Sequence, residues 1–318
     1  MRFSVFFDVP LAVTAMMPDS VLVTVPGTTS NLGPGFDCLG AALTLANRFR
    51  FTRTTAGLQI TVTGTEADRV VADASNLAYQ SFLKVFDYIG QTAPGLDLDI
   101  QLNVPLSRGL GSSATAIVGG LMGGNVLAGS PLSQAEIMEL AIAQEGHPDN
   151  VVPALLGGCR LAACDEGQWT ICEVPCHPDV ALVLGIPDFE VSTAEARRVL
   201  PQTYSRADAI FNMAHLGLLL RGLESGNPDW LRKALKDRIH QPYRKSLMHG
   251  FEAVQAGAIA AGAYGLVISG AGPTMLAIAP PANTEKIAQA MQRAWAKESI
   301  QSVVQVLTID PVGTRLAD

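Results

Sequence analysis

A glycine-rich stretch, PLSRGLGSSAT at residues 105–115, has the residue types and spacing to hold phosphate. Glycine lets the backbone turn sharply and lets N–H groups approach an anion closely. A helix that begins just after such a turn directs its free amides at the same anion. Gly109 and Gly111 lie in the expected turn, and Ser112 and Ser113 lie where a helix would begin. Their hydroxyl groups suit a phosphate oxygen or Mg²⁺, a hard cation that prefers oxygen ligands.

This stretch is not the common nucleotide-binding loop. That loop has the form G-x-x-x-x-G-K-[ST], and here no lysine follows the glycines. The alternative interpretation is a structural glycine turn whose serines cap a helix. The loop by itself leaves both interpretations open.

Three further stretches gather polar side chains in dense turns. Each of them, taken alone, is more often a structural turn than a site. They are PGTTSNLGPGFDCLG (26–40), with Asn31 and Asp37; GHPDN (146–150), with His147, Asp149 and Asn150; and ISGAGPTMLAI (268–278).

The composition favours a folded protein that acts on small molecules. The 318 residues are 48% hydrophobic and 16% charged, which argues against disorder, and the length suits two domains. A net charge of −7 repels a phosphate backbone, so we expect no nucleic-acid partner, although a few local arginines can still bind a small anion. The uncharged stretch 253–284 is interrupted by glycines and prolines, so we expect no membrane span and a cytoplasmic protein.

The five cysteines do not form a recognisable framework. Four of them cluster near His177 without the paired C-x-x-C spacing of a structural zinc site, so we expect reduced thiols. These four are Cys159, Cys164, Cys172 and Cys176.

The first residues imitate a signal peptide only superficially. Asp8 and Pro10 interrupt the apolar run after Arg2, and no clear cleavage site follows. Met17 is an alternative start, so residues 1–17 are expected to be a disordered or misannotated extension.

The remaining pattern predicts an α+β fold in two domains, 18–172 and 173–318. Apolar–polar alternation predicts strands, and S-x-x-E at Ser133 and Glu136 predicts a capped helix. The turn GHPDN is predicted to lead into a strand over 152–164. The second half mixes strands and helices without the regular alternation of a doubly wound sheet. Predicted strands are 21–26, 44–54, 58–64, 96–105 and 179–187; predicted helices are 76–88, 133–145, 193–200, 206–224, 228–239 and 246–261.

Taken together and in this order, these motifs resemble the GHMP kinase superfamily, and within it the homoserine kinase family. The resemblance covers nearly the whole chain from about Val21, with minor departures at Gly27 and Ser30. It implies an N-terminal domain like ribosomal protein S5 domain 2, a ferredoxin-like C-terminal domain and an active site between them. The motifs are TTSNLGPGFD, GLGSSA, EGHPDNV, STAEARRVLP and D-x-x-x-QPYR.

The resemblance also implies where ATP and Mg²⁺ bind. Asn76 would contact the adenine, although a polar residue at a helix start is the simpler interpretation. Ser113, with or without Ser112, and Glu139 would hold the metal, although a solvated helix carboxylate is the commoner role for a glutamate. The phosphates would lie in the loop formed by Pro105, Leu106, Ser107, Arg108, Gly109, Leu110, Gly111, Ser112, Ser113, Ala114 and Thr115.

The acceptor implied by the resemblance is L-homoserine, phosphorylated on its side-chain hydroxyl. An arginine fork matches a carboxylate. Arg197 and Arg244 would bind that group, with Arg198 and Arg238 as competing arginines. Asp37, beside Asn31, would bind the ammonium group. His147 and Asn150 would line the pocket, and Thr193 would lie near the transferred phosphoryl group unless it only caps a helix.

Two points stay open at this stage. An amide cannot take a proton, so Asn150 cannot be a base; either no strong base acts, or Asp149 does. The activity could also belong to another small-molecule kinase of the superfamily, or the chain could be a non-catalytic nucleotide-binding relative. The family often forms homodimers, but no interface can be identified from the sequence.

Overall fold

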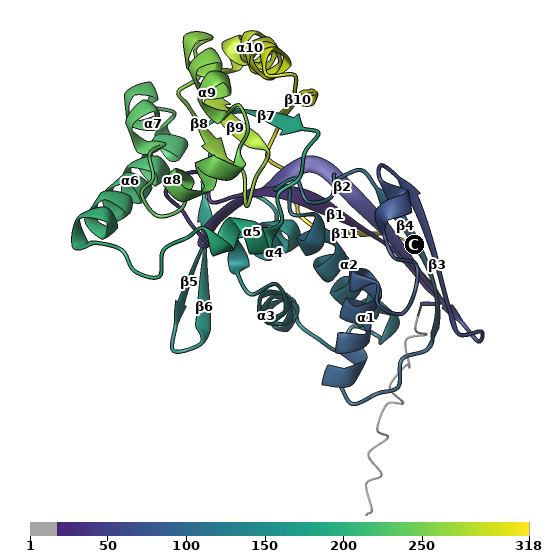
Figure 1. Ribbon diagram of the computed structural model, residues 1–318. Coiled ribbons are helices and arrows are strands. Elements are labelled where there is room, and N and C mark those ends of the chain that lie inside the picture. The colour runs from purple at the N-terminus through teal and green to yellow at the C-terminus, as the bar shows by residue number, and fades with distance from the viewer. Residues whose placement is uncertain (1–17, 318) are drawn as a thin grey trace, which may run out of the picture.

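The protein is built from two antiparallel-rich sheets, each covered by helices (Figure 1). The computed structural model describes residues 18–317, so the expected extension at 1–17 lies outside the described residues. One sheet has seven strands and the other four, with helices packed against both, and the predicted α+β class is confirmed. Among the helices of residues 18–317, none has the length and apolar character needed to cross a membrane.

The first sheet contains β1 (Ser20–Ser30), β2 (Leu39–Thr54), β3 (Leu58–Gly64), β4 (Gly95–Leu102), β5 (Cys159–Asp165), β6 (Gln168–Val174) and β11 (Arg315–Ala317). Its order is β11-β1-β2-β4-β3, with β5 paired to β2 and β6 to β5. The pair β3–β4 is parallel, and the other neighbours are antiparallel. The loop between β1 and β2 carries Asn31 and Asp37, so the pairing of these two strands positions both side chains.

Four helices cover one face of this sheet: α1 (Leu77–Tyr88), α2 (Ser112–Leu127), α3 (Gln134–Glu145) and α4 (Pro148–Leu156). A short 3₁₀ turn, η1 (Ala67–Arg69), precedes them. Helix α2 lies very close to the sheet. A Cβ atom on Gly119 would lie 2.6 Å from the ring of Phe49, and one on Gly123 would lie 2.4 Å from the ring of Phe51. These small residues let α2 approach the buried phenylalanines, and this contact sets the position of its N-terminus.

The second sheet has the order β10-β7-β9-β8 and is antiparallel throughout. Trp295 is fully buried, and a Cβ on Gly185 of the sheet would lie 2.5 Å from its ring. The strands are β7 (Ala181–Pro187), β8 (Gly265–Ile268), β9 (Met275–Ala279) and β10 (Ser302–Leu307). The helices are α5 (Thr193–Arg198), α6 (Arg206–Ser225), α7 (Pro228–Ala234), α8 (Gln241–Arg244), α9 (Phe251–Ala260) and α10 (Thr284–Lys297), with 3₁₀ turns η2 (Lys245–Leu247) and η3 (Pro281–Asn283).

The end of the chain returns to the first sheet. Strand β11, the last described element, pairs with β1, so that Leu22 opposes Ala317 (Figure 1). Strand β6 of the first sheet ends at Val174, and β7, the first strand of the second sheet, begins at Ala181. The division into 18–172 and 173–318 stays a prediction, and the strand pairing links the last residues to the first sheet.

The structure corrects the prediction for residues 146–164. Pro148 to Leu156 forms α4 instead of a turn and a strand, and the strand begins only at Cys159. Proline at the first helical position and Asp149 in the first turn suit a helix N-terminus. Pro153 lacks the N–H that would bond the Asp149 carbonyl, and that carbonyl oxygen packs against Gly40 of β2.

Gly40→Ala is expected to destabilise the protein and to displace the start of α4. A Cβ at Gly40 would lie 1.7 Å from the Asp149 carbonyl oxygen, which is a backbone atom and cannot swing aside. Overpacking of this kind costs about 1–3 kcal/mol. Urea unfolding measures the change. Gly57→Ala is the matched control, because a Cβ there meets no heavy atom within 4 Å. Equal free energies of unfolding for Gly40→Ala and the wild type would contradict the packing argument.

Candidate functional site

A cavity of about 470 Å³ lies where loops of the two sheets meet. Its lining falls into two chemical groups, joined by the loop residues 106–113. The apolar group is Phe49, Val70, Val71, Leu77, Ile100 and Leu102. The polar group includes Asn31, Asp37, Arg69, Asn76, Glu145, His147, Asp149, Asn150, Thr193, Arg197 and Arg244.

The glycine loop is held by backbone and hydroxyl contacts from β1 and from the turn after β8. Gly109 has φ +73°, and a Cβ there would lie 2.2 Å from the Ser269 carbonyl oxygen. Gly111 has φ +67°, and a Cβ there would lie 2.0 Å from Thr28 Oγ1. The Thr28 amide donates to the Leu110 carbonyl at 2.9 Å, and Ser269 Oγ donates to the Gly109 carbonyl at 2.7 Å. Only glycine fits at these two positions, so the loop has one shape.

The N-terminus of α2 is open towards a ligand. Its cap is Gly111, which offers no side chain to the free amides, and Ser112 and Ser113 are the first helical residues. The serines therefore do not cap the helix, as the structural interpretation of this loop would require. Free amides at the positive end of a sixteen-residue helix are suited to bind an anion.

Arg108, the only cation of the loop, is used to hold the loop in place. Its guanidinium donates to the carbonyls of Leu106, Pro187 and Asp188 at 3.0–3.1 Å. It also pairs with Glu190 at 2.9 Å. Arg108 is expected from the resemblance to contact phosphate, but its nitrogens link the loop to the end of β7.

Three expected loop residues lie outside the cavity lining. Ala114 and Thr115 are fully buried inside α2, and the Thr115 hydroxyl accepts from Asn47 at 2.8 Å. Pro105 precedes the part that reaches the cavity, which runs from Leu106 to Ser113. Ala114 and Thr115 therefore support the helix from behind and do not face a ligand.

Asn76 lines the cavity and also caps α1. Its side-chain oxygen accepts from the amides of Ala78 and Tyr79, and its Nδ2 donates to the Val71 carbonyl at 2.8 Å. The helix predicted over 76–88 thus has Asn76 as its cap and begins at Leu77. Capping accounts for most of the hydrogen-bonding capacity of Asn76, and one N–H remains.

Asp37 and Arg197 form a bidentate ion pair at the cavity. The two distances are 3.0 and 2.9 Å, and both side chains are about one-third exposed. Asn31 positions Asp37 by accepting from its amide at 3.0 Å, and Asn31 Nδ2 donates to the Gly270 carbonyl. The expected ammonium-binding and carboxylate-binding groups therefore neutralise each other in this structure.

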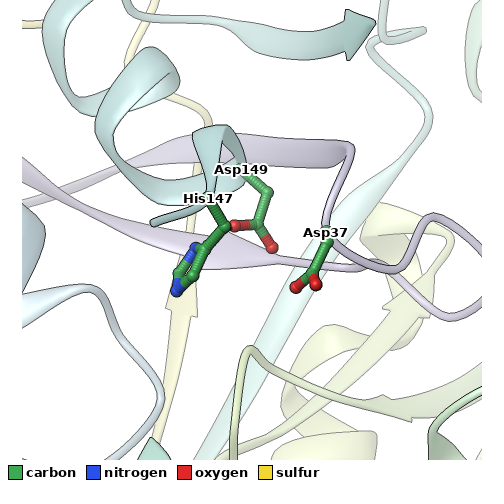
Figure 2. A group of neighbouring side chains, drawn as sticks. All are labelled: Asp37, His147 and Asp149. Carbon is green, nitrogen blue, oxygen red and sulfur yellow. The ribbon is translucent and has the colours of Figure 1, made fainter. Parts of the chain in front are cut away.

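His147 and Asp149 lie at the start of α4 and face Asp37 across the cavity (Figure 2). His147 Nδ1 lies 2.6 Å from Asp149 Oδ1. Burial alone would lower the pKa of His147, but the hydrogen bond and charge of Asp149, with the charge of Glu145, outweigh it and raise the pKa above 6.5. Asp37, His147 and Asp149 are close enough to suggest a cation site. Arg197 and His147 already partner the two carboxylates, which disfavours that use.

Asn150 and Thr193 reach the cavity in different ways. Asn150 is buried, its oxygen accepts from Thr28 Oγ1 at 2.8 Å, and its Nδ2 donates to Ser30 Oγ at 3.1 Å. Thr193 is exposed and begins α5, but Ser192 provides the cap. The structure thus removes the helix-capping explanation for Thr193.

The structure does not bring Glu139 together with Ser113. Glu139 is exposed on α3 and lies outside the cavity lining, and Glu145 instead accepts from Ser113 Oγ at 2.9 Å. The two glutamates are six positions apart, which places them about 240° apart around a helix. Burial raises the pKa of Glu145, opposed in part by His147 and the Ser113 hydrogen bond. Its place directly before Gly146 in EGHPDNV is the signal that could have identified it.

Arg244 is buried, whereas its two competitors are not. Burial lowers the pKa of Arg244 to about 10, with Asp37 opposing the shift. Arg244 Nε donates to the Ala196 carbonyl and Nη1 to the Gly270 carbonyl, at 3.1 and 2.9 Å. Arg198 and Arg238 are exposed, and Arg238 pairs with Asp208. Of these four candidate arginines, the fold therefore brings Arg197 and Arg244 to the cavity.

Comparison with known proteins first defines the class. Residues 76–158 match the family model of the GHMP kinases N-terminal domain, and residues 219–297 match that of the GHMP kinases C-terminal domain. Both matched segments contribute to the fold around the cavity.

Individual relatives then narrow the family. A homoserine kinase of Trichormus variabilis is 64% identical over 92% of this chain and 98% of its own length. One from Nostoc punctiforme is 61% identical over 93% and 98%. The crystal structure of homoserine kinase from Cytophaga hutchinsonii has a TM-score of 0.86 and 29% identity, covering 99% of this chain and 100% of that one. The chain belongs to the homoserine kinase family of the GHMP kinases.

We expect the pKa of His147 to fall in Asp149→Asn. The substitution removes the hydrogen bond to a carboxylate and its charge, and leaves burial, which lowers the pKa. In the wild type the raised His147 pKa stabilises the folded protein. This stabilisation is fully present below pH about 6.5, the pKa of an unfolded histidine, and is lost as the pH rises through the pKa of the folded state. NMR titration of the five histidines measures the pKa. An unchanged His147 pKa in the variant would show that Asp149 does not control it.

Proposed function

We propose that this protein transfers the γ-phosphoryl group of ATP to the side-chain hydroxyl of L-homoserine, giving ADP and O-phospho-L-homoserine. One observation carries the proposal. A single cavity combines an open helix N-terminus, suited to phosphate, with the Asp37 carboxylate and the guanidinium groups of Arg197 and Arg244, suited to an amino acid. Membership of the homoserine kinase family supports the choice of acceptor. We further propose a cytoplasmic, homodimeric enzyme of threonine biosynthesis.

The nucleotide would occupy the apolar lining and the glycine loop. The apolar residues around Val70 and Val71 suit an adenine ring, with the remaining N–H of Asn76 directed to the base. The amides of Ser112 and Ser113 and the α2 dipole would bind the phosphates. These groups supply the positive potential for which other nucleotide loops use a lysine.

The residues beside the loop fit a magnesium ion. Ser113 Oγ and Glu145 supply hydroxyl and carboxylate oxygens, the ligands that Mg²⁺ prefers. Burial raises the pKa of Glu145 because neighbouring positive charge compensates the carboxylate only in part, and a bound cation would complete that compensation. We therefore propose Ser113 and Glu145 as metal-binding residues in place of the pair Ser113 and Glu139. Mg²⁺, when bound, would neutralise charge on the phosphate oxygens.

The acceptor would insert its charged groups at the Asp37–Arg197 pair. Asp37 would bind the ammonium group, and Arg197 and Arg244 the carboxylate. Arg244 is already desolvated and held by two backbone carbonyls, so little further ordering is needed on binding. His147 and Asn150 would orient the hydroxyl, and Thr193 would contact the transferred group.

In the reaction, the acceptor oxygen bonds to the γ-phosphorus as the bond from that phosphorus to the β–γ bridging oxygen breaks. Positioning and charge stabilisation supply most of the catalysis in such transfers. Asn150 cannot accept the hydroxyl proton, and Asp149 already accepts from His147. We favour transfer without a strong base, the proton leaving late to phosphate or water. A loss of turnover near 10²–10⁴-fold in Asp149→Asn, roughly the range of general-base catalysis, would instead favour Asp149 as the base.

The decisive experiment is a coupled ADP-release assay with Mg²⁺ and ATP. L-homoserine, L-serine, L-threonine, mevalonate and shikimate are offered in parallel, and turnover selective for L-homoserine is expected. Arg244→Ala should lower kcat/KM for L-homoserine by about 10²-fold, the loss expected for hydrogen bonds to a charged group. Arg238→Ala is the matched control, because Arg238 is exposed and pairs with Asp208.

Two other results would overturn the proposal in different ways. Turnover only with mevalonate or shikimate would indicate another small-molecule kinase. ATP binding without turnover of any acceptor would indicate a non-catalytic relative.

Glu145→Gln is expected to lower kcat by about 10²-fold or more and to raise the Mg²⁺ concentration needed for half-maximal rate, since one charged ligand is lost. Glu139→Gln, an exposed position on the same helix, should stay within about twofold of the wild type because exposed substitutions of this kind perturb little. Magnesium titrations of both variants measure the difference. The reverse pattern would return the metal role to Glu139.

A further inference from the structure

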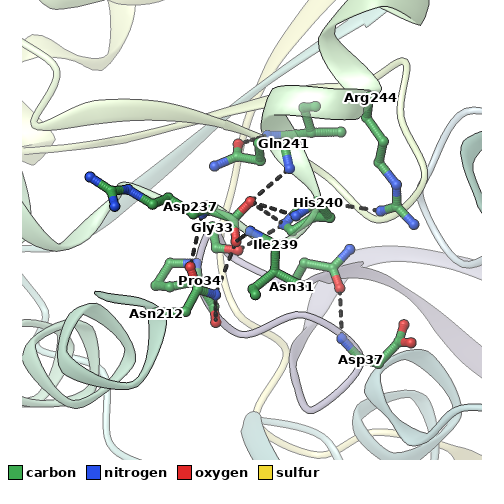
Figure 3. Close-up of polar contacts among 12 residues, drawn as sticks. Asn31, Gly33, Pro34, Asp37, Asn212, Asp237, Ile239, His240, Gln241 and Arg244 are labelled. Carbon is green, nitrogen blue, oxygen red and sulfur yellow. Dashed lines mark hydrogen bonds and ion pairs between the residues drawn. The ribbon is translucent and has the colours of Figure 1, made fainter. Parts of the chain in front are cut away.

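A buried hydrogen-bond network lies behind the acceptor end of the cavity (Figure 3). Its centre is Asp237, whose side chain is fully buried. Asp237 accepts from Asn212 Nδ2 at 3.0 Å and from three backbone amides, those of residues 239, 240 and 241, at 2.7–3.0 Å. Four donors compensate a buried carboxylate without the need for a lysine or arginine. The amides belong to the turn that leads into α8, so Asp237 determines the path of this turn.

The turn delivers His240, which is also fully buried, to two partners. His240 Nε2 lies 2.8 Å from the Gly33 carbonyl oxygen. A carbonyl only accepts, so Nε2 carries the proton. Nδ1 is then an acceptor, and Arg244 Nη1 donates to it at 3.3 Å. Burial lowers the pKa of His240, opposed by Asp237, which agrees with a neutral ring bearing one N–H.

The contacts of His240 join the two parts of the acceptor end, the loop with Asn31 and Asp37 on one side and Arg244 on the other. Gly33 belongs to the loop that carries Asn31 and Asp37, and Phe36 of the same loop stacks on the His240 ring at 5.2 Å between centroids. The Arg244 guanidinium lies 5.1 Å from the Phe36 centroid. One imidazole therefore contacts the loop through Gly33 and Phe36, and the guanidinium through Nδ1.

The orientation of Arg244 follows from this arrangement. Nε and Nη1 have carbonyl partners, and Nη1 also has His240. Among the interactions of residues 18–317, none involves Arg244 Nη2, which leaves that nitrogen for a ligand in the cavity. A guanidinium held at three points loses little rotamer freedom when it binds a carboxylate.

We propose that His240 is a positioning residue for the acceptor: it holds Arg244 and the 31–37 loop at the separation that an amino-acid carboxylate and ammonium group require. The inference rests on the proposed function, because it assumes a zwitterionic acceptor. Asp237 supports His240 from behind, and neither residue lines the cavity.

Two substitutions separate the partners of His240. His240→Gln keeps an N–H for the Gly33 carbonyl and removes the acceptor for Arg244. His240→Asn keeps an acceptor near the Nδ1 position and removes the contact with Gly33. We expect each to raise KM for L-homoserine by about tenfold or more, with KM for ATP within about twofold of the wild type. His215→Gln is the control, because it makes the same change at a histidine that lies outside the cavity lining and stacks on Phe211 within its own helix, α6.

A double-mutant cycle shows whether His240 acts through Arg244. In an Arg244→Lys background, His240→Gln should change KM for L-homoserine much less than in the wild type, since the shared interaction is already lost. Additive effects in the cycle, or an equal rise in both KM values, would reduce His240 to a structural role and overturn the proposal. His240→Asn with the same cycle is used if His240→Gln does not fold.

The two proposals can fail separately. An inactive wild type with L-homoserine contradicts the proposed function. An active wild type whose KM values are unchanged by both His240 substitutions contradicts only the role of His240.

Discussion

The site depends on the close contact of the glycine loop with Thr28 of β1 and Ser269 of the β8–β9 turn. Neither Gly109 nor Gly111 has room for a Cβ, because the Ser269 carbonyl and the Thr28 hydroxyl occupy that space. The Thr28 amide from β1 and Ser269 from the β8–β9 turn bond to the loop directly. The phosphate-binding amides and the acceptor-binding groups are thereby parts of one packed unit, which suits a reaction governed by positioning.

The electrostatics follow from this packing. An acidic chain presents an anion site by using helix amides, which carry no net charge, and commits the loop arginine to structure. At the acceptor end each of two carboxylates has a partner: Arg197 for Asp37 and His147 for Asp149. Arg244 is held by carbonyl oxygens and a neutral imidazole. A zwitterionic ligand can share these partners without leaving an uncompensated buried charge.

Much of the fold could be predicted from local patterns. The α1, α3 and α6 helices and strands such as β3 and β7 agree with the sequence prediction to within a few residues, because their periodicity and capping residues are local signals. Residues 148–156 are predicted wrongly, since an internal proline, Pro153, disfavours a helix and the paired valines favour a strand. Helix α4 forms because its buried residues pack between the first sheet and its neighbouring helices. Strands β6 and β11 were missed, the latter because three residues carry no pattern of their own.

The sequence by itself determined the chemistry of the site: a glycine loop before a helix, the residues of GHPDN, and two arginines in recognisable motifs. These are facts of residue type and spacing, and they identify the family. Only the tertiary structure decided which side chains these residues contact. Whether Glu139 or Glu145 reaches Ser113 depends on how α3 is rotated against α2, and whether Arg108 faces phosphate depends on the carbonyls at the end of β7. His240 becomes important only because residues 207 positions apart in the sequence meet in the fold. Contacts of this kind are set by packing between distant segments, for which local sequence carries no signal.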